Sequence, residues 1–209
     1  MTARIEHTVT SGTFSLDGQT FDVENNVWVL GDDRECVVID APHEVEPILD
    51  LVAGRAVRAI LCTHAHDDHV RVAPQLAEAT GAPVLLHPDD MVLWDLVHPG
   101  HKPDGWLTHG QEIAVAGTTL RVLHTPGHAP GACCFVAPEL GTVFTGDTLF
   151  VGGPGATGRS HSDFSTIVAS IRDDLLTLPA ETVVRTGHGD TTTVGAESPH
   201  LQEWLARGH

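Results

Sequence analysis

The sequence predicts a layered α/β fold, in which two β-sheets carry helices on their outer faces. Three observations support this prediction. Short strand patterns fill the first forty residues, strand and helix patterns then alternate, and a second strand-rich stretch is followed by helix, strand and helix. No Ser/Gly-rich linker divides the 209 residues, so we expect one domain over residues 1–209.

The first half of the chain begins with short strands that are separated by turn signals at Asp17-Gly18 and at Gly31-Asp32-Asp33. Apolar runs of strand length then alternate with helical patterns, one of which stops at Gly81. The expected strands are 13–16, 21–23, 26–30, 35–39, 57–62 and 83–86, and the expected helices are 44–53, 70–80 and 89–97.

The second half returns to strands before it ends in helices. The expected strands are 112–115, 119–123, 132–136, 142–145 and 182–185, and the expected helices are 164–176 and 199–206. Residues 147–163 show no periodicity and contain four glycines between 152 and 158. A structureless segment of this length in a compact domain is usually functional.

Charge and composition exclude several classes of protein. Eleven basic residues against 28 acidic ones give a net charge of −17, which disfavours binding to nucleic acid or to an anionic membrane. No apolar run reaches the roughly 20 residues of a membrane span, and residues 1–10 have no apolar signal segment. The four cysteines form no CxxC pair, so we expect buried, reduced thiols in a cytoplasmic protein.

Metal-competent side chains are concentrated after the predicted strand 57–62. Four of them fall within six residues, and the set comprises His64, His66, Asp68 and His69. Alternation in an extended segment directs His64, His66 and Asp68 to one side. One loop then offers more ligands than a single ion uses, and this spacing suits two adjacent metal sites.

Three further candidates each follow a predicted strand, namely His128, Asp147 and His188. A lone histidine in a turn is more often solvated, and a polar loop can be rich in histidine without binding metal. Here, however, four strand ends offer His and Asp together, and the strand ends of layered sheets converge on one edge. The residues therefore predict a centre for two divalent metal ions.

At this point the sequence resembles the metallo-β-lactamase-fold hydrolases. The motifs are HxHxDH from His64 to His69, TPGH at His128, GDTLF at Asp147 and GHG at His188. The resemblance implies a four-layer αββα sandwich. It also implies that His64, His66 and His128 hold one metal, that Asp68, His69 and His188 hold the other, and that Asp147 bridges them. Asp40 matches a strand-end Asp that supports the site, although Ala41-Pro42 follows it where the family often has Ala-Gly.

Within this family the motifs TPGHAPG and GDTLF resemble the glyoxalase II-like group, which hydrolyses thioesters. The resemblance implies attack by a metal-bridging hydroxide, with Asp68 and Asp147 as catalytic residues and zinc, iron or manganese as the metal. True β-lactamases of this fold lack the counterpart of His69 and carry a signal segment, so antibiotic hydrolysis is not expected. Residues after His188 include one basic residue, Arg207, so the glutathione grip of full-length glyoxalase II is missing or different.

The loop at 155–160 resembles actinobacterial members that are associated with mycothiol. We therefore expect hydrolysis of an S-acyl conjugate of a low-molecular-weight thiol such as mycothiol, with Arg159 as a substrate contact. His98, His101 and His109 are further candidates to line the cleft, or they are exposed loop residues.

Two alternatives stay open. Persulfide dioxygenases resemble this fold and share HxHxDH, but they bind one iron through the counterparts of His64, His128 and Asp147, so the ligand residues alone do not exclude them. Their GRTDF-like stretch is approximated by residues 158–164, which are two residues longer. The other alternative is a metal-binding module without turnover.

Overall fold

The computed structural model describes residues 2–208, so the two ends of the expected domain, Met1 and His209, lie outside the described residues. The first sheet has six strands in the order β1-β2-β3-β4-β5-β6. Strands β1 to β3 pair antiparallel, whereas β3 to β6 pair parallel. The strands are β1 (Arg4–Leu16), β2 (Gln19–Gly31), β3 (Glu35–Ile39), β4 (Ala56–Leu61), β5 (Val84–Leu86) and β6 (Gly105–Trp106).

The second sheet also has six strands, in the order β14-β13-β10-β9-β8-β7. Its only parallel pair among the described residues is β10 with β13, so both of these strands end at the same edge of the sheet. The strands are β7 (Glu112–Val115), β8 (Thr118–His124), β9 (Cys133–Ala137), β10 (Thr142–Gly146), β13 (Val183–Thr186) and β14 (Thr192–Thr193).

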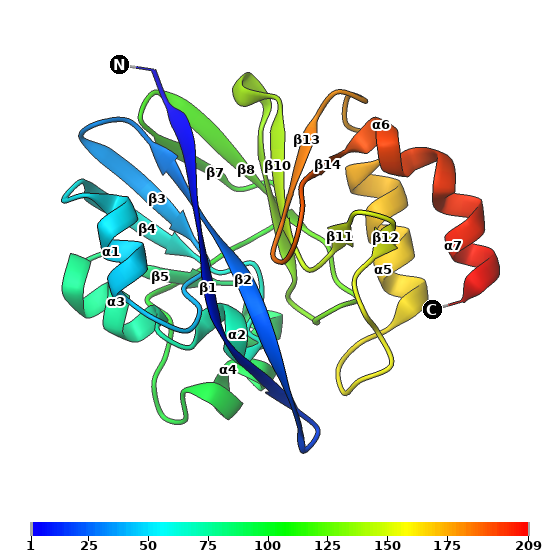
Figure 1. Ribbon diagram of the computed structural model, residues 1–209, viewed down its shortest axis with the longest axis horizontal. Helices are drawn as coiled ribbons and strands as arrows, with labels where there is room; N and C mark the ends of the chain where they lie inside the picture. The colour runs from blue at the N-terminus through cyan, green and yellow to red at the C-terminus, as the bar shows by residue number, and fades with distance from the viewer. Residues whose placement is uncertain (1, 209) are drawn as a thin grey trace.

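Helices cover the outer face of each sheet (Figure 1). On the first sheet lie α1 (Glu46–Val52), α2 (Asp67–Val70), α3 (Ala73–Thr80) and α4 (Met91–Val97). On the second lie α5 (Phe164–Ser170), a π-helical segment (Ile171–Leu175), α6 (Val194–Glu197) and α7 (Leu201–Arg207). Short 3-10 turns are formed by Pro88–Asp90, Pro138–Leu140 and Ser198–His200.

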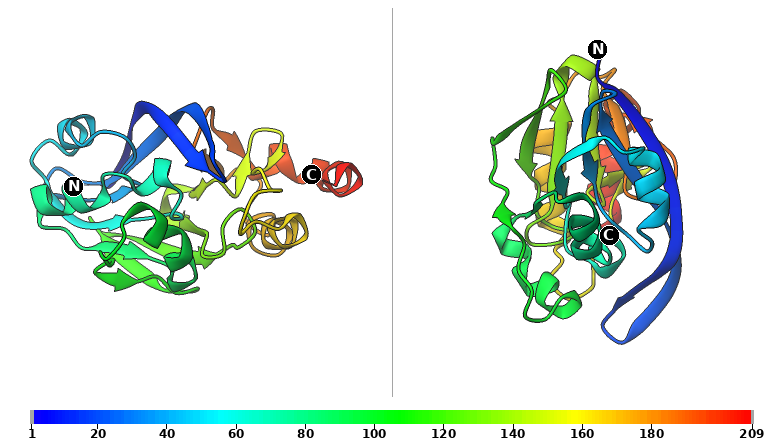
Figure 2. Two further views of the ribbon diagram at one scale, coloured as in Figure 1. Left: turned by 90° about the horizontal axis from the view of Figure 1, so that it is seen from below. Right: turned by 90° about the vertical axis from the view of Figure 1, so that its left-hand side faces the viewer.

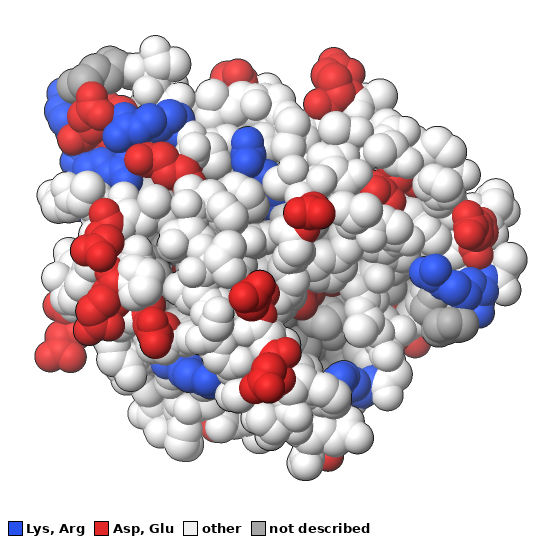
Figure 3. Space-filling model, viewed as in Figure 1, with Lys and Arg blue, Asp and Glu red and all other residues white. Residues whose placement is uncertain are grey.

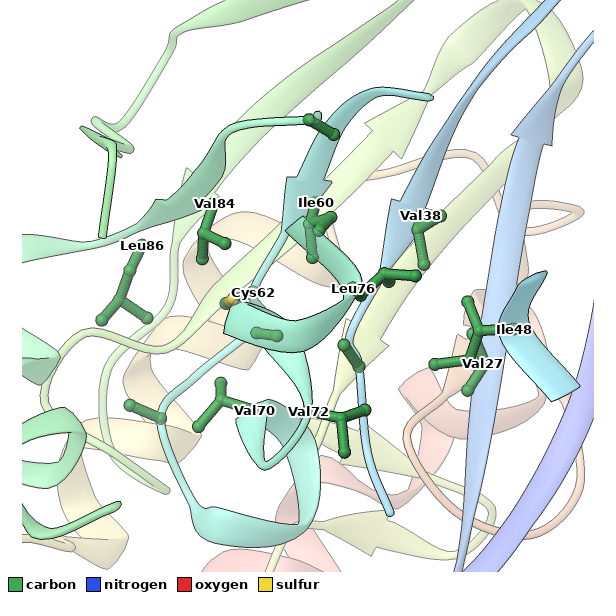
Figure 4. Close-up of a cluster of buried hydrophobic side chains, with 14 of the residues drawn as sticks. Val27, Val38, Ile48, Ile60, Cys62, Val70, Val72, Leu76, Val84 and Leu86 are labelled. Carbon is green, nitrogen blue, oxygen red and sulfur yellow. The ribbon is translucent and has the colours of Figure 1, made fainter. Parts of the chain in front are cut away.

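Three apolar layers hold these four layers of secondary structure together. Because side chains alternate along a strand, Val27 and Val29 of β2 face the helices while Trp28 and Leu30 face the other sheet. Figure 4 shows the layer beneath α1 to α3, where Ile48 and Leu76 contact the sheet. The second layer fills the space between the sheets, and the third lies beneath α5 and α7. The predicted αββα sandwich is confirmed.

The strands at the N-terminus differ from the prediction. We expected separate strands at 13–16, 21–23 and 26–30, but β1 and β2 form one continuous hairpin that is paired from Arg4–Gly31 to Leu16–Gln19. Most of β1 is exposed or half-buried, so it lacks the alternation that marks a half-buried strand. The hairpin runs along one side of the molecule and its tip projects beyond the sheet (Figure 2).

Two further differences concern helix and loop boundaries. The expected helix 70–80 is interrupted, because Pro74 lacks an N–H and occupies the first turn of a new helix, α3, after α2 has ended at Val70. The expected loop 147–163 contains a two-stranded ribbon of β11 (Leu149–Phe150) and β12 (Gly153–Pro154). These strands are too short to produce a periodic pattern. Within residues 2–208, no helix is long and apolar enough to cross a membrane.

The layer between the sheets provides a test of the packing. Phe144 of β10 is fully buried there, with its ring 6.1 Å from that of Trp28. We expect Phe144→Ala to lower the free energy of unfolding by about 3–5 kcal/mol, because it removes apolar contacts and leaves a cavity. Val151→Ala is the control, since Val151 is 58% exposed and its truncation is expected to cost less than about 0.5 kcal/mol. Chemical denaturation measures both, and equal losses would contradict the packing described.

Candidate metal centre

The structure brings all seven predicted ligand residues to one edge of the two sheets. His64 and His66 lie in the loop after β4, and Asp68 and His69 lie in the short helix α2. The other three follow strands of the second sheet, with His128 after β8, Asp147 after β10 and His188 after β13. Strand ends from both sheets therefore supply one cluster.

The first group consists of His64, His66 and His128. The Nδ1 atom of His66 lies 3.0 Å from the Nε2 atoms of both His64 and His128. His128 donates its Nδ1–H to the carbonyl oxygen of Ala156, and His64 donates its Nδ1–H to the Thr63 hydroxyl, which in turn donates to Asp40. Both Nε2 atoms therefore present lone pairs toward His66.

The second group consists of Asp68, His69 and His188. The Nε2 atoms of the two histidines are 3.2 Å apart. The Asp68 Oδ2 atom lies 3.3 Å from the His188 Nε2 atom and 3.6 Å from the His69 Nε2 atom. His69 donates its Nδ1–H to Asp40, and His188 donates its Nδ1–H to the Glu24 carbonyl. The Nε2 atoms of both histidines therefore face the centre, as those of His64 and His128 do in the first group.

Asp147 lies between the two groups. Its Oδ2 atom is 3.6 Å from the His128 Nε2 atom and 3.3 Å from the His188 Nε2 atom, and its Oδ1 atom is 3.4 Å from the His69 Nε2 atom. Gly187 permits this approach, because a Cβ atom there would collide with the Asp147 carboxylate and with the His69 ring. Asp147 thus faces both groups, as the bridging role implied by the resemblance would require.

The side chains fit metal ions better than they fit one another. Within the first group, one His66 Nδ1–H can bond only one of the two lone pairs that face it. Between the two groups, the buried Asp147 Oδ1 atom has no hydrogen-bond partner within residues 2–208. Convergent imidazole and carboxylate groups of this kind are ligands for zinc, iron or manganese.

Electrostatics distinguish the two groups. Burial, together with its histidine neighbours, lowers the pKa of His66 to about 3 and also lowers the pKa values of His64 and His128. These three rings are therefore neutral at pH 7, which is the form that binds metal.

The second group carries protons when no metal is bound. Burial opposes charge on both histidines, but the Asp147 carboxylate raises the pKa of His188 to about 10, and with Asp68 it raises that of His69 as well. Burial likewise opposes ionisation of the acids, yet the charge of His69 lowers the pKa of Asp68 to about 2, and His188 and His69 lower that of Asp147.

Several supporting residues were missed by the sequence reasoning. Asp90 is fully buried, accepts hydrogen bonds from the backbone N–H groups of Ala65 and Gly131, and so links the His64–His66 loop to the His128 turn. Asn25 and His43 lie behind the second group. The sequence offered two signals for these residues. Asn25 belongs to an Asn-Asn pair beside an apolar strand, and Asp90 follows shortly after Pro88. Asp40, by contrast, was expected to support the site, and it bonds both Thr63 and His69.

A cavity of about 160 Å³ opens onto the centre. It is lined by Phe14, Val23, Ala156, Arg159 and the residues His66, Asp68, His128, Asp147 and His188. Arg159, the expected substrate contact, is thus among the residues that line the cavity. His98, His101 and His109 do not line this cavity; His98 donates to the Val70 carbonyl, and the other two are exposed.

His87, His124 and the four cysteines lie outside the centre. His87 and His124 lie near Asp89, but their rings stack at 3.8 Å and 13°, so their in-plane lone pairs run parallel and do not converge on one ion. All four cysteines are buried and free, as expected. Burial raises the pKa of Cys62 well above its ordinary value, so this thiol next to the histidine motif is a poor nucleophile.

The chain matches the Metallo-beta-lactamase superfamily over residues 21–188, and it therefore belongs to this superfamily, whose members are generally metal-dependent hydrolases. Among curated relatives, the chain is 31% identical over 189 residues to the hydroxyacylglutathione hydrolase GloC of Haemophilus influenzae, covering 83% of this chain and 89% of the relative. It is 33% identical over 189 residues to the probable metallo-hydrolase YqgX of Bacillus subtilis, covering 84% and 90%.

Solved structures show the same fold. TTHA1623 in a di-iron-bound form has a TM-score of 0.75 at 36% identity, covering 90% of this chain and 96% of that one. The B3 metallo-beta-lactamase BLEG-1 has a TM-score of 0.78 at 29% identity, covering 93% and 99%. ETHE1 from Myxococcus xanthus has a TM-score of 0.75 at 28% identity, covering 94% and 85%.

The two groups predict different pH dependence of metal binding. A metal ion at the second group must displace the proton that His188 holds with a pKa of about 10 and the proton of His69, whose pKa is also raised. Its apparent affinity should therefore rise about a hundredfold per pH unit between pH 6 and 8. The first group is already neutral in this range, because the pKa of His66 is about 3, and its affinity should change less than about threefold.

Chelator-competition titrations at several pH values measure both affinities. Calorimetry in buffers of different protonation enthalpy counts the protons that are released by each ion. An identical pH dependence for both ions would contradict the assignment of protons to the second group.

Proposed function

We propose that the protein is a dinuclear metal-dependent hydrolase that cleaves a thioester, the S-acyl conjugate of a low-molecular-weight thiol such as mycothiol. The observation that carries the two-ion part is the completeness of both groups, with Asp147 facing each of them. Zinc is the proposed metal, with iron or manganese as alternatives. A di-iron form of a structural neighbour supports a two-ion centre in this fold.

Metal ions at such a centre lower the pKa of bound water toward about 7 and polarise the substrate carbonyl. The protein's own residues orient the reactants. Burial opposes ionisation of Asp68 and Asp147, yet in the metal-free chain the charges of His69 and His188 keep the pKa values of both carboxyl groups low. Metal cations at the centre would replace those histidine charges, so both carboxylates would accept hydrogen bonds at neutral pH. We assign them to hold the attacking water against the substrate.

The cavity favours a leaving group that departs as an anion. Its titratable lining consists of five candidate ligand residues and Arg159, so no lining side chain is free to donate a proton as a general acid. A thiol with a pKa near 8.5 leaves as a thiolate without such an acid, whereas an amine or an alkoxide does not. This argument supports a thioester over an amide or an ordinary ester.

Arg159 is the proposed contact for the thiol carrier. Its guanidinium lies 4.7 Å from the ring centroid of Phe21 and 5.1 Å from that of Phe14, and its Nη1 atom is buried without a hydrogen-bond partner in the described chain. Cation–π contacts fix the group while its donors remain available for substrate oxygens. The small cavity supports a short acyl group, such as formyl or lactoyl.

The relatives support the same class of substrate. GloC is named for hydrolysis of hydroxyacylglutathione, and this chain covers 89% of its length. We propose a small-molecule partner and a cytoplasmic location, with no nucleic-acid or membrane partner. Acidic side chains are spread across the face in Figure 3, in keeping with the net charge of −17.

A mononuclear iron persulfide dioxygenase is the second candidate. It is favoured by the likeness to ETHE1 and by the approach of Asp147 to His128, two of the three ligands that such a site uses. The hydrolase is favoured by the likeness to TTHA1623, which is 36% identical and has been solved in a di-iron-bound form.

Thiol release distinguishes the two candidates. The metal-loaded protein is incubated with S-lactoylglutathione and with S-formyl- and S-lactoyl-mycothiol, and free thiol is detected with a chromogenic disulfide. We expect turnover of at least one thioester. Oxygen consumption with glutathione persulfide, and no thiol release from any thioester, would instead support the dioxygenase.

Substitution of Arg159 tests its role. We expect Arg159→Ala to raise KM for the thioester about tenfold with little change in kcat, because a group remote from the reacting carbonyl binds ground state and transition state alike. Arg159→Lys should raise KM by less than Arg159→Ala does. Arg121→Ala is the matched control, since Arg121 is exposed on β8 and does not line this cavity, and a KM increase of equal size in this variant would refute the assignment.

A further inference from the structure

Asn25 is a buried side chain of β2 that faces the whole second group. It has no exposed surface, and its Nδ2 atom lies 3.1 Å from the Asp68 Oδ2 atom. The same nitrogen is 3.3 Å from the His69 Nε2 atom and 3.4 Å from the His188 Nε2 atom. One amide group therefore contacts every member of this group.

The charge of Asp68 determines how the amide is oriented. An ionised carboxylate only accepts hydrogen bonds, so the amide NH₂ faces Asp68 and the amide oxygen faces away. On that side the Asn25 Oδ1 atom lies 2.8 Å from the Nε2 atom of His43. His43 therefore donates Nε2–H to Asn25, and Asn25 donates N–H to Asp68.

His43 is itself held in place. It lies in the loop before α1, and the backbone of β1 packs against it so closely that a Cβ atom at Gly12 would collide with the ring. Its Nδ1 atom is buried and makes no hydrogen bond with the described residues. Among the described residues, the ring thus makes one hydrogen bond, which is the bond to Asn25, and this bond fixes the amide.

We propose that Asn25, held by His43, is a positioning residue for the second metal ion and not for the first. This inference rests on the two-ion centre of the proposed function. The amide donates a hydrogen bond to the Asp68 Oδ2 atom and so fixes the plane of the carboxylate. Within residues 2–208, His64, His66 and His128 form no hydrogen bond with Asn25. Partners of this kind that orient ligands commonly change metal affinity by about 10–100-fold.

The test measures the two stepwise zinc affinities of the full-length protein by chelator competition, with the absorption spectrum of the Co²⁺-loaded protein as a second readout. We expect Asn25→Ala to weaken the second affinity by about 10–100-fold and the first by less than about threefold. His43→Ala should shift the second affinity in the same direction, because the amide is then free to rotate.

Thr142→Val is the matched control. It removes another buried hydrogen bond, from the Thr142 hydroxyl to the Val183 carbonyl, but at the beginning of β10 and therefore at the edge far from the centre. Both zinc affinities should stay at the wild-type values.

Two outcomes would overturn the positioning role alone. The first is that Asn25→Ala keeps both zinc affinities at the wild-type values. The second is that both affinities weaken equally, which is what a purely structural role produces. If Asn25→Ala does not fold, His43→Ala decides on the same criteria, since His43 lies outside the ligand cluster. A wild-type protein that binds only one zinc ion would contradict the proposed dinuclear function as well, and so the two failures are distinguishable.

Discussion

The centre depends on the hydrogen bonds that its histidines make away from it. Four of the five rings in the cluster donate Nδ1–H to a partner that is fixed by the fold, and these partners are Thr63, Asp40, Ala156 and Glu24. Each bond selects one tautomer and directs the Nε2 lone pair inward. Without these outward bonds, the same residues would be a set of buried polar groups with no defined direction.

The layered fold supplies those partners from elements that are far apart in the sequence. The Glu24 carbonyl comes from the N-terminal hairpin, and that of Ala156 comes from the loop after β12, which also carries Arg159. The hairpin tip holds this loop, because Asp17 accepts a hydrogen bond from the Ser160 N–H. The strands and loops that fix the ligands therefore also shape the cavity over them.

The sequence was most informative where spacing and strand ends coincide. Apolar runs located the core strands. The HxHxDH loop with His128, Asp147 and His188 located the cluster of candidate ligands, because strand ends converge. The sequence was uninformative where strand pairing or tertiary burial determines the structure. The exposed strand β1 has no alternation to detect, and Asn25 and Asp90 gain their roles from neighbours 43 and 25 residues away. Such contacts become visible only when the sheets are assembled.

The proposed centre holds two metal ions between the two sheets of one chain. Elemental analysis of the purified protein, with metal equivalents counted per chain, is the most direct test of this proposal. We expect about two equivalents of zinc, iron or manganese, with retention of both ions at pH 8. A single equivalent, all of it iron, would contradict the two-ion centre and support the mononuclear dioxygenase.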